Sequence, residues 1–409
     1  MSDALPGEAA PPSRWLTAAQ AAARLGVKPQ TLYAYVSRGL VRSDRVRGAG
    51  GGRTSRYDRS DIERLAGRRR GGGRAGALEL LVDTELTLLD PAGRLYYRGR
   101  DATELAGSWS YERTAEWLWT GRDDGQPPPW RAPEAALVAA RAATAGLGPD
   151  VALVDRMRLA CVAAATTDPL RHDRRPEAVT VTGRALVSVL VETLPGPEGV
   201  EGGVAGRLWS RLAPEPGGAG VGVLDTALVL LADHELAAST FGARVAASTW
   251  ADPYLVVETG LGVLGGPLHG GASEEALALL RDAAGTGPAE AIGRRLRSGS
   301  RIPGLGHSVY VGADPRAFTL LGEVRRVAGG SAEWATVEAV LDTLEGRNLP
   351  APNIDLAVAA MAHCFGLRPG AGESVFAVSR CAGWLAHAIE EYRHRLRFRP
   401  RAVYTGTPV

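Results

Sequence analysis

The sequence contains little cysteine and no long apolar segment, and both absences restrict what the protein can be. Its cysteines are Cys161, Cys364 and Cys381, three in 409 residues. Such a sparse, odd-numbered set provides neither a disulfide framework nor the spacing of a metal site. No apolar run approaches the roughly 20 residues that cross a bilayer, and residues 1–12 lack the basic and apolar regions of a signal peptide. We expect a cytoplasmic protein whose residues 1–12 are disordered.

The sequence is also nearly without lysine, and its charge is unevenly distributed. Lys28 is the only lysine, so arginine supplies the other basic side chains. The net charge is +2, but residues 1–76 carry 15 basic and 6 acidic side chains, a net +9, which leaves −7 for the rest. The composition is otherwise that of a globular protein, with 45% hydrophobic and 22% charged residues. The asymmetry predicts a basic module fused to a mildly acidic body.

The basic module shows the pattern of two short helices. Thr17 is expected to cap a helix over residues 18–25, and Gly26 to close it. Pro29 suits the first turn of a second helix over residues 30–38. The apolar side chains that these helices would bury are Leu16, Ala22, Leu25, Val27, Leu32 and Val36.

Residues 16–27 resemble the first helix and turn of a MerR-like or excisionase-like helix-turn-helix domain, and residues 53–65 resemble its wing and following helix. The resemblance implies a winged helix-turn-helix over residues 13–66, with a recognition helix that enters the major groove of DNA. The side chains expected to contact DNA are Gln30, Thr31, Tyr33, Arg38, Arg53 and Arg56. The alternatives are a solvated basic face, or a fold kept for contacts with another protein. Residues 67–77, rich in glycine and arginine, are typical of a flexible linker.

Beyond the linker the pattern becomes almost entirely helical. Alternating apolar residues over 79–99 first predict a β-hairpin. Apolar residues then recur at helical spacing. The segments with this spacing are residues 110–119, 134–145, 151–165, 179–192 and 223–247.

Three turns rich in glycine or proline each carry one side chain suited to acid-base chemistry. They are His269 in residues 265–272, His307 after residues 301–306, and Asp355 in residues 352–355. The second turn presents backbone amides and an imidazole, and Arg316 follows with a guanidinium, which suits an anionic carbonyl compound. Taken singly, that turn could be a plain surface loop, and Asp355 could be the cap of a helix over residues 356–365.

Taken together and in this order, the three motifs resemble those of citrate synthase. The resemblance extends to residues 232–241, 379–384 and 399–406, and covers the chain from about residue 78 to its end. It implies a mainly α protein: an all-α, two-domain citrate synthase fold preceded by the small winged helix-turn-helix domain. The large domain would comprise residues 78–270 and 373–409, and the small domain residues 271–372.

The resemblance also assigns roles to individual side chains. Asp355 would be the base that removes a proton from the acetyl-CoA methyl group, aided by a pKa that desolvation raises. His269, at the start of a helix over residues 273–282, would stay neutral and donate to the enol oxygen, while His307 would polarise the oxaloacetate carbonyl. The residues that match the oxaloacetate-binding set are His234, Arg316, Arg380 and Arg399. Those that match the coenzyme A segment are Arg301, Pro303, Gly304, Leu305 and Gly306.

Citrate formation requires no metal or redox cofactor, since acetyl-CoA and oxaloacetate supply the reacting groups, and it belongs to the tricarboxylic acid cycle. The residue matching Arg399 reaches the other subunit's site in this family, which implies a homodimer. The sequence departs from the family at Ser273, Ser308 and residues 356–358. These departures do not touch the catalytic groups, but they leave undecided which acyl-CoA is the substrate. The alternatives are a 2-methylcitrate synthase acting on propionyl-CoA, and a transcription regulator whose citrate synthase fold is catalytically idle.

The other histidines receive no role. His172 and His394 lie among charged residues and should be exposed. His363 and His387 should be packed within helices, with function not expected.

Overall fold

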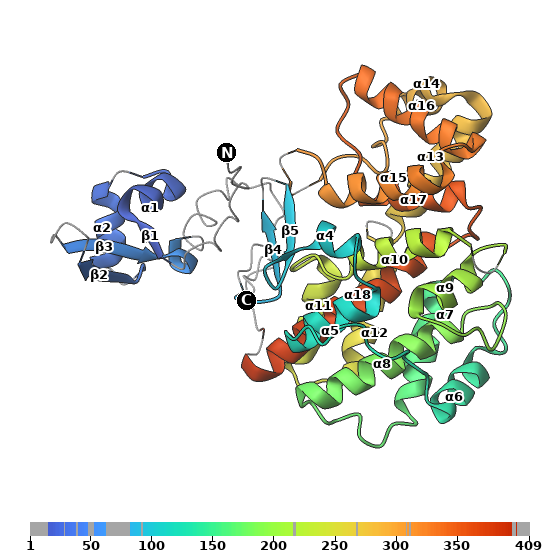
Figure 1. Cartoon of the computed structure of the whole chain (residues 1–409), viewed down its shortest axis with the longest axis horizontal. Coiled ribbons are helices and arrows are strands. Elements are labelled where there is room, and N and C mark those ends of the chain that lie inside the picture. The colour runs from blue at the N-terminus through green and yellow to red at the C-terminus, as the bar shows by residue number, and fades with distance from the viewer. Residues whose placement is uncertain are drawn as a thin grey trace, which may run out of the picture. The chain divides into compact units, whose positions relative to one another are not determined.

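The computed structural model divides the chain into two compact units, Met1–Asp83 and Thr84–Val409 (Figure 1). It describes residues 15–27, 29–37, 40–47, 53–62, 82–90, 93–215, 218–266, 269–307, 309–310, 312–394 and 398. Most of the described residues are helical. Across these ranges, no helix has the length and apolar character needed to cross a membrane.

The first unit packs two helices on a small sheet. Its elements are β1 (Trp15–Thr17), α1 (Ala18–Leu25), α2 (Pro29–Ser37), β2 (Ser43–Arg47) and β3 (Arg53–Asp58), and the antiparallel sheet has the order β1-β3-β2. The predicted cap of the first helix is confirmed, since Thr17 and Gln20 form a reciprocal capping box. Gly26 ends that helix in the left-handed conformation, with φ 61°. Strand β1 was not predicted.

The small core of this unit contains the apolar side chains that the helical pattern predicted, together with four that it did not predict, Ala21, Val41, Tyr57 and Ile62. Its buried members are Leu16, Ala21, Ala22, Leu25, Leu32, Val41, Tyr57 and Ile62, with Val27 and Val36 packed against them. The sequence alone therefore located half of the buried members, Leu16, Ala22, Leu25 and Leu32.

The second unit begins with the predicted hairpin, extended by a short third strand. It consists of β4 (Thr87–Asp90), β5 (Arg94–Tyr97) and β6 (Arg100–Asp101), paired antiparallel in that order. Tyr97 is buried at the end of β5, and its hydroxyl lies within hydrogen-bonding distance of the carbonyl oxygens of Val229, Leu230 and Asp233. The hairpin is thereby fixed to a distant turn that carries His234.

Helices form the rest of this unit around one long buried helix, α18 (Ala371–His394). Figure 1 shows α18 running through the middle of its neighbours, and it contacts α5, α7, α8, α10, α11 and α12. The helices of this group are α4 (Ala102–Ala106), α5 (Tyr111–Thr120), α6 (Glu134–Thr144), α7 (Leu153–Ala165), α8 (Pro176–Glu192), α9 (Val204–Leu212), α10 (Gly220–Leu231), α11 (Ala238–Ser248) and α12 (Pro253–Leu264). Close packing requires glycine at Gly260, because a Cβ there would lie 2.5 Å from the ring of Trp384.

A second group of helices packs mainly on itself. It comprises α13 (Ala272–Thr286), α14 (Pro288–Arg297), α15 (Pro315–Ala328), α16 (Ala332–Gly346) and α17 (Ile354–Cys364), which Figure 1 shows gathered together. Three of these helices also reach the first group, since α15 contacts α10, and α13 and α17 contact α18. The division into a large and a small domain at particular residues stays a prediction.

One helix predicted from periodicity is wrong. Residues 223–247 form two helices, because α10 ends at Leu231 and α11 begins only at Ala238. Between them Glu235 takes the left-handed conformation, with φ 53°, and its amide donates to the side chain of Asp233. The turn breaks the helical ladder and presents His234, which continuous apolar periodicity could not reveal.

Candidate active site

The turns that carry His307 and Asp355 are joined by backbone hydrogen bonds. Leu305 and Pro352 form an isolated antiparallel bridge. The amide of Asn353 donates to the carbonyl of Gly304 at 2.9 Å, and its side-chain amide donates to the carbonyl of Gly306 at 3.0 Å. Two loops nearly fifty residues apart in sequence thus form one surface, with His307 at the end of one and Asp355 at the end of the other.

Asp355 does not cap the helix it enters. The N-cap of α17 is Asn353, whose side chain accepts a hydrogen bond from the amide of Asp355 at 3.0 Å. The Asp355 carboxyl is closely surrounded by protein, although part of the residue stays accessible. This burial raises its pKa to about 6 and outweighs Arg316, which acts in the opposite direction. Asp355 is therefore not the cap of this helix, and its raised pKa is in the range that suits a general base.

His307, His234 and Tyr310 form an aromatic cluster. The ring centroids of His234 and His307 are 5.1 Å apart, and those of His307 and Tyr310 are 4.7 Å apart. The Nδ1 atom of His307 accepts from the amides of Val309 at 3.0 Å and Tyr310 at 3.4 Å. Because burial and then Arg316 lower the pKa of His307, the ring is neutral. Its single proton therefore lies on Nε2, which is the atom able to donate to a ligand.

His234 is also kept neutral. Burial lowers its pKa well below the ordinary value, and the charges of Arg316 and Arg380 act in the same direction. Its Nε2 atom lies 3.2 Å from the hydroxyl of Tyr310. A neutral imidazole in the field of two guanidinium groups can hydrogen-bond to an anion without itself carrying a charge.

The two buried arginines are held in different ways. Arg316 is gripped by Asp314, with Nε–Oδ1 and Nη2–Oδ2 distances of 3.0 and 2.8 Å. Arg380 donates through Nε to the carbonyl of Leu231 at 2.8 Å, whereas its buried Nη1 has no hydrogen-bond partner among the described residues. A buried guanidinium nitrogen left unpaired in this way needs an acceptor, and a carboxylate of a ligand would supply one.

His269 lies just before α13, whose N-cap is Gly271. Its Nε2 atom lies 2.8 Å from the hydroxyl of Ser239 at the start of α11. Burial, followed by the charge of Arg380, lowers the pKa of His269 to about 4. The ring is neutral, as the sequence predicted. The cause is burial and the charge of Arg380, whereas the prediction had named the helix N-terminus.

Each of the four titratable side chains of the site is affected by the charge of Arg316, of Arg380 or of both. The charge of Arg380 acts on the pKa values of His234, His269 and Asp355, and that of Arg316 on His234, His307 and Asp355. Elements far apart in the chain therefore bring three imidazoles, one carboxylate and two guanidinium groups to one place. Such a set can remove one proton while it binds and polarises an anionic carbonyl compound.

The predicted coenzyme A segment lies at the edge of this site. Its four residues Pro303 to Gly306 form the bridged loop, in which Gly304 has φ 79° and a Cβ would lie 2.8 Å from the Cβ of Leu356. Arg301 is exposed where the loop begins. Arg399, expected to bind oxaloacetate, lies outside the described residues.

The predicted DNA-contacting residues are only partly described. Arg38 and the side chains of Gln30 and Arg53 lie outside the described parts. On α2, Thr31 is half-buried and Tyr33 is 55% exposed. Arg56 is held within its own unit, because it forms an ion pair with Asp44 at 2.6 Å and stacks over the ring of Trp15 at 4.6 Å.

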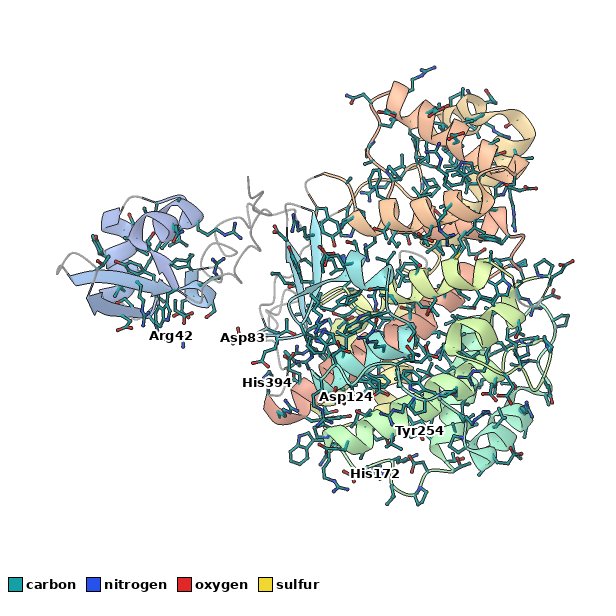
Figure 2. The ribbon with its side chains drawn as sticks, viewed as in Figure 1. Arg42, Asp83, Asp124, His172, Tyr254 and His394 are labelled. Carbon is teal, nitrogen blue, oxygen red and sulfur yellow. The ribbon has the colours of Figure 1, made fainter. Side chains whose placement is uncertain are left out.

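Sequence reasoning missed several polar residues of the site. Ser239 and Tyr310 lay inside the recognised motifs but received no role. His387 was predicted to be a packed helix residue, and it is fully buried on α18. It lies two helical turns after Arg380, on the same face, and this spacing could have drawn attention to it. The two histidines predicted to be exposed, His172 and His394, lie at the surface (Figure 2).

The chain is similar to known proteins over most of its length. Residues 79–401 match the family model described as citrate synthase, C-terminal domain, and residues 15–70 match one described as a helix-turn-helix domain. A citrate synthase of Haloferax volcanii is 31% identical, over 80% of this chain and 94% of its own. A 2-methylcitrate synthase 1 of Corynebacterium glutamicum is 32% identical, over 44% of this chain and 49% of its own. A solved citrate synthase of Thermoplasma acidophilum, in a ternary complex with carboxymethyl coenzyme A and oxaloacetate, shares the fold with a TM-score of 0.66, at 24% identity over 81% of this chain and 95% of that one.

Proposed function

From the premise that this chain belongs to the citrate synthase family, we propose that it condenses acetyl-CoA with oxaloacetate to give citrate and free coenzyme A. The observation that carries the proposal is the meeting of His234, His269, His307 and Asp355 in the field of two buried arginines. The enzyme would be an acyltransferase of the tricarboxylic acid cycle, acting in the cytoplasm.

Asp355 is the base in this proposal. With a pKa of about 6 its carboxyl group is largely ionised at neutral pH, yet basic enough to accept a proton from the acetyl methyl group. His269, neutral because of its low pKa, donates a hydrogen bond to the thioester oxygen as that oxygen gains enolate character. Stabilising the developing charge with a neutral donor keeps the proton on the imidazole and avoids forming a fully protonated enol.

Oxaloacetate binds through its two carboxylates and its ketone. The unpaired Nη1 of Arg380 and the guanidinium of Arg316 would bind the carboxylates, and the neighbouring His234 would hydrogen-bond to them. The Nε2–H of His307 would donate to the ketone oxygen and polarise the carbonyl carbon. The enolate carbon then attacks that carbon, and the ketone oxygen takes up one proton to become the hydroxyl of citryl-CoA, which balances the proton removed by Asp355. Water then hydrolyses the thioester: its hydroxyl joins the acyl carbon and its remaining proton joins the leaving sulfur, which releases the coenzyme A thiol.

Named side chains supply the base and the donors to each negative charge that develops before the citryl thioester forms, so the proposal requires no metal or redox cofactor. Coenzyme A is carried by the substrate and is expected to lie along the loop of residues 301–306. Arg399 is proposed to complete the oxaloacetate site.

The test is release of free thiol from acetyl-CoA in the presence of oxaloacetate. Rapid release by the purified protein, abolished in Asp355→Asn, supports the proposal, and no release from any acyl-CoA would refute it. The 2-methylcitrate synthase among the relatives keeps a second substrate open. A profile of acetyl-CoA against propionyl-CoA decides between the two, because the preferred acyl group shows the higher kcat/KM.

We further propose that the first unit binds DNA, as the helix-turn-helix match supports. The exposed Tyr33 on α2 and the basic charge of residues 1–76 are the features that favour it. The competing function is a transcription regulator with an idle enzyme body, but such a body has no need of a carboxyl group with a raised pKa at Asp355. A DNA-shift assay over a salt series, run beside the thiol assay, separates enzyme, regulator and bifunctional protein.

A homodimer is the proposed assembly. Exposed apolar side chains gather on the adjacent helices α7 and α12, namely Leu159, Val162 and Leu255, with exposures of 41, 53 and 52%. The same surface carries the ion pair of Arg158 with Glu258 at 3.1 Å. Apolar side chains set side by side on two packed helices are typical of an interface between subunits. Light scattering on Leu159→Glu, expected to be monomeric, tests this surface.

A further inference from the structure

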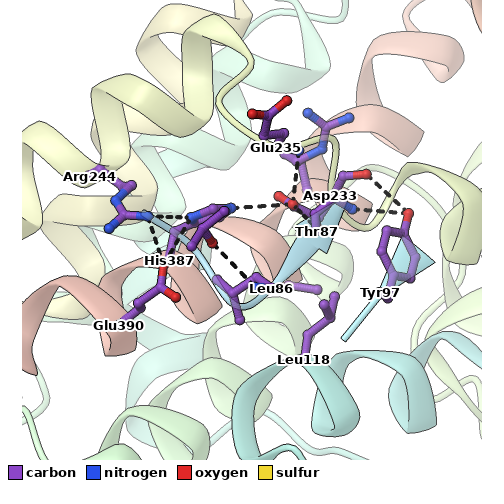
Figure 3. A network of polar contacts seen from close by, with 12 residues as sticks. Leu86, Thr87, Tyr97, Leu118, Asp233, Glu235, Arg244, His387 and Glu390 are labelled. Carbon is purple, nitrogen blue, oxygen red and sulfur yellow. Dashed lines mark hydrogen bonds and ion pairs between the residues drawn. The ribbon is translucent and has the colours of Figure 1, made fainter. Parts of the chain in front are cut away.

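The turn that presents His234 is held by a buried polar network. Asp233, the preceding residue, is fully buried, and its Oδ2 atom accepts from the hydroxyl of Thr87 at 2.5 Å and the amide of Glu235 at 3.1 Å. The third donor is Nε2 of His387 on α18, at 3.3 Å. Figure 3 shows these side chains converging on Asp233 from the hairpin, the turn and the long helix.

The tautomer of His387 follows from its second contact. Nη1 of Arg244 lies 3.1 Å from Nδ1 of His387, and because a guanidinium can only donate, Nδ1 must accept. The imidazole proton therefore lies on Nε2 and is donated to Asp233. Arg244 is itself fixed by Glu391 at 2.8 Å and Glu390 at 2.7 Å, so the ring of His387 has one orientation available (Figure 3).

The carboxylate of Asp233 is tightly packed, and only one of its two oxygens is hydrogen-bonded among the described residues. Its Oδ1 atom is buried without a hydrogen-bond partner among the described residues. A Cβ on Gly383, also on α18, would lie 2.2 Å from that atom. Loss of one of the three donors to Oδ2 would leave a buried charge poorly compensated, and the turn would have to shift to recover a partner.

The same helix fixes the backbone before the turn and carries a substrate-binding arginine. Arg380 donates to the carbonyl of Leu231, and the amide of Gly383 donates to the carbonyl of Ala232. His387 lies further along the same face of α18 and contacts Asp233, the residue before His234. Through Arg380 and His387, the single helix α18 fixes the segment of residues 231–233 that leads to His234.

We propose that His387 is a positioning residue for the oxaloacetate site: its Nε2–H fixes the carboxylate of Asp233, which holds the turn so that His234 faces Arg316 and Arg380. The proposal rests on the proposed function of that site. Among the described residues, the ring of His234 contacts His307 and Tyr310, and no contact with residues 301–306 carries the connection further. The connection therefore affects binding of the keto acid and leaves binding of the acyl-CoA unchanged.

The test compares His387→Gln with His387→Leu. Glutamine can donate its amide N–H to Asp233 and accept from Arg244, whereas leucine fills the space and does neither. In His387→Leu we expect KM for oxaloacetate to rise about ten- to a hundredfold, since displacement of a binding group by about 1 Å has effects of that size. We expect KM for acetyl-CoA to stay within twofold, and His387→Gln to recover most of the oxaloacetate affinity.

Two further variants separate positioning from general damage. Tyr392→Phe removes a part-buried hydrogen bond of the same helix, from the Tyr392 hydroxyl to the carbonyl of Ala251, which is not part of the network around His234. It should lower the melting temperature without changing either KM. Thr87→Val, which removes another donor to Asp233 from a different element, should reproduce the oxaloacetate effect, while Thr87→Ser should not.

The outcomes are distinct. If KM for both substrates changes equally in His387→Leu, or if glutamine gives no rescue, His387 is structural only and the inference is overturned. Should His387→Leu fail to fold, an unchanged oxaloacetate KM in Thr87→Val overturns it instead. If the unaltered protein releases no thiol, the proposed function fails first, and calorimetric binding of oxaloacetate to the same variants still decides whether His387 positions the site.

Discussion

Asp314 and Arg316 form a buried bidentate ion pair within one turn of chain. The carboxylate also accepts the amide of Arg316 at the start of α15 and the amide of Ile354 at the start of α17, each at 3.1 Å. One side chain therefore fixes the guanidinium proposed to bind oxaloacetate and the first turn of the helix that carries Asp355. Asp314 thereby sets the positions of the proposed base and of its cationic neighbour relative to each other.

The first prediction concerns Asp314. Asp314→Asn leaves a cap but removes the charge, so Arg316 becomes an uncompensated buried cation, and we expect a loss of about 3 kcal/mol in the free energy of unfolding. KM for oxaloacetate should rise at least tenfold, because the guanidinium loses its fixed orientation. Glu323→Gln is the control, since it breaks only the exposed ion pair with Arg326 on the same helix. Denaturant unfolding should show a change below about 1 kcal/mol for the control, and equal effects of both variants would contradict the assigned role.

The second prediction concerns the base. Asp355→Asn should lower kcat by about 10²- to 10⁴-fold while leaving binding of oxaloacetate intact. In the unaltered enzyme kcat/KM should fall as pH drops through about 6, because Asp355 must be deprotonated to accept a proton. The acid limb cannot come from His269, whose pKa is about 4. A rate profile that is flat between pH 5 and 7 would argue against Asp355 as the base.

The same substitution has a consequence for stability. A carboxyl group whose folded-state pKa is raised stabilises the folded protein when protonated and loses that contribution as pH rises through about 6. Above pH 6, the free energy of unfolding of Asp355→Asn should therefore exceed that of the unaltered protein by about 2–3 kcal/mol. The gain should vanish below pH 4, where both states carry a protonated acid, and urea unfolding at pH 4 and 8 measures the difference.

The third prediction concerns the partner of His269. Ser239→Ala removes the hydroxyl that contacts Nε2, and we expect kcat to fall about tenfold as the ring loses its fixed orientation. The fold should persist, because only one hydrogen bond of about 1 kcal/mol is lost. Ser210→Ala, which removes a buried hydroxyl bonded only to the carbonyl of Arg207, is the matched control and should leave kcat unchanged.

The fourth prediction separates two effects at the bridged loop. Gly304→Ala should destabilise the protein by about 2–3 kcal/mol and raise KM for acetyl-CoA, because both the left-handed conformation and the contact with Leu356 oppose a Cβ. Gly299→Ala has the same kind of conformation, with φ 69°, but open space around it. It should cost about 1–2 kcal/mol and leave KM unchanged. Identical KM values in the two variants would remove the loop from the acyl-CoA site.

Local signals in the sequence predicted much of the fold correctly. The capping box of Thr17, the left-handed Gly26 and the hairpin of β4 and β5 each depend on residues a few positions apart, and each was found. The helix over residues 223–247 failed, because its apolar periodicity continues through the turn at Asp233. What breaks that helix is a set of contacts from Tyr97 and α18, and no local pattern encodes them.

The sequence by itself determined which residue types are available for the chemistry: the order of motifs assembled two histidines, an aspartate and a set of arginines, and it fixed the family. Only the tertiary structure decided their protonation states and orientations. His387 reaches Asp233 across 154 positions of the chain, Asn353 takes the cap that Asp355 could have formed, and Val309 and Tyr310 set the tautomer of His307. The physical reason is that a pKa or a tautomer depends on burial and on the neighbouring donors and charges, and packing brings these together from distant parts of the sequence.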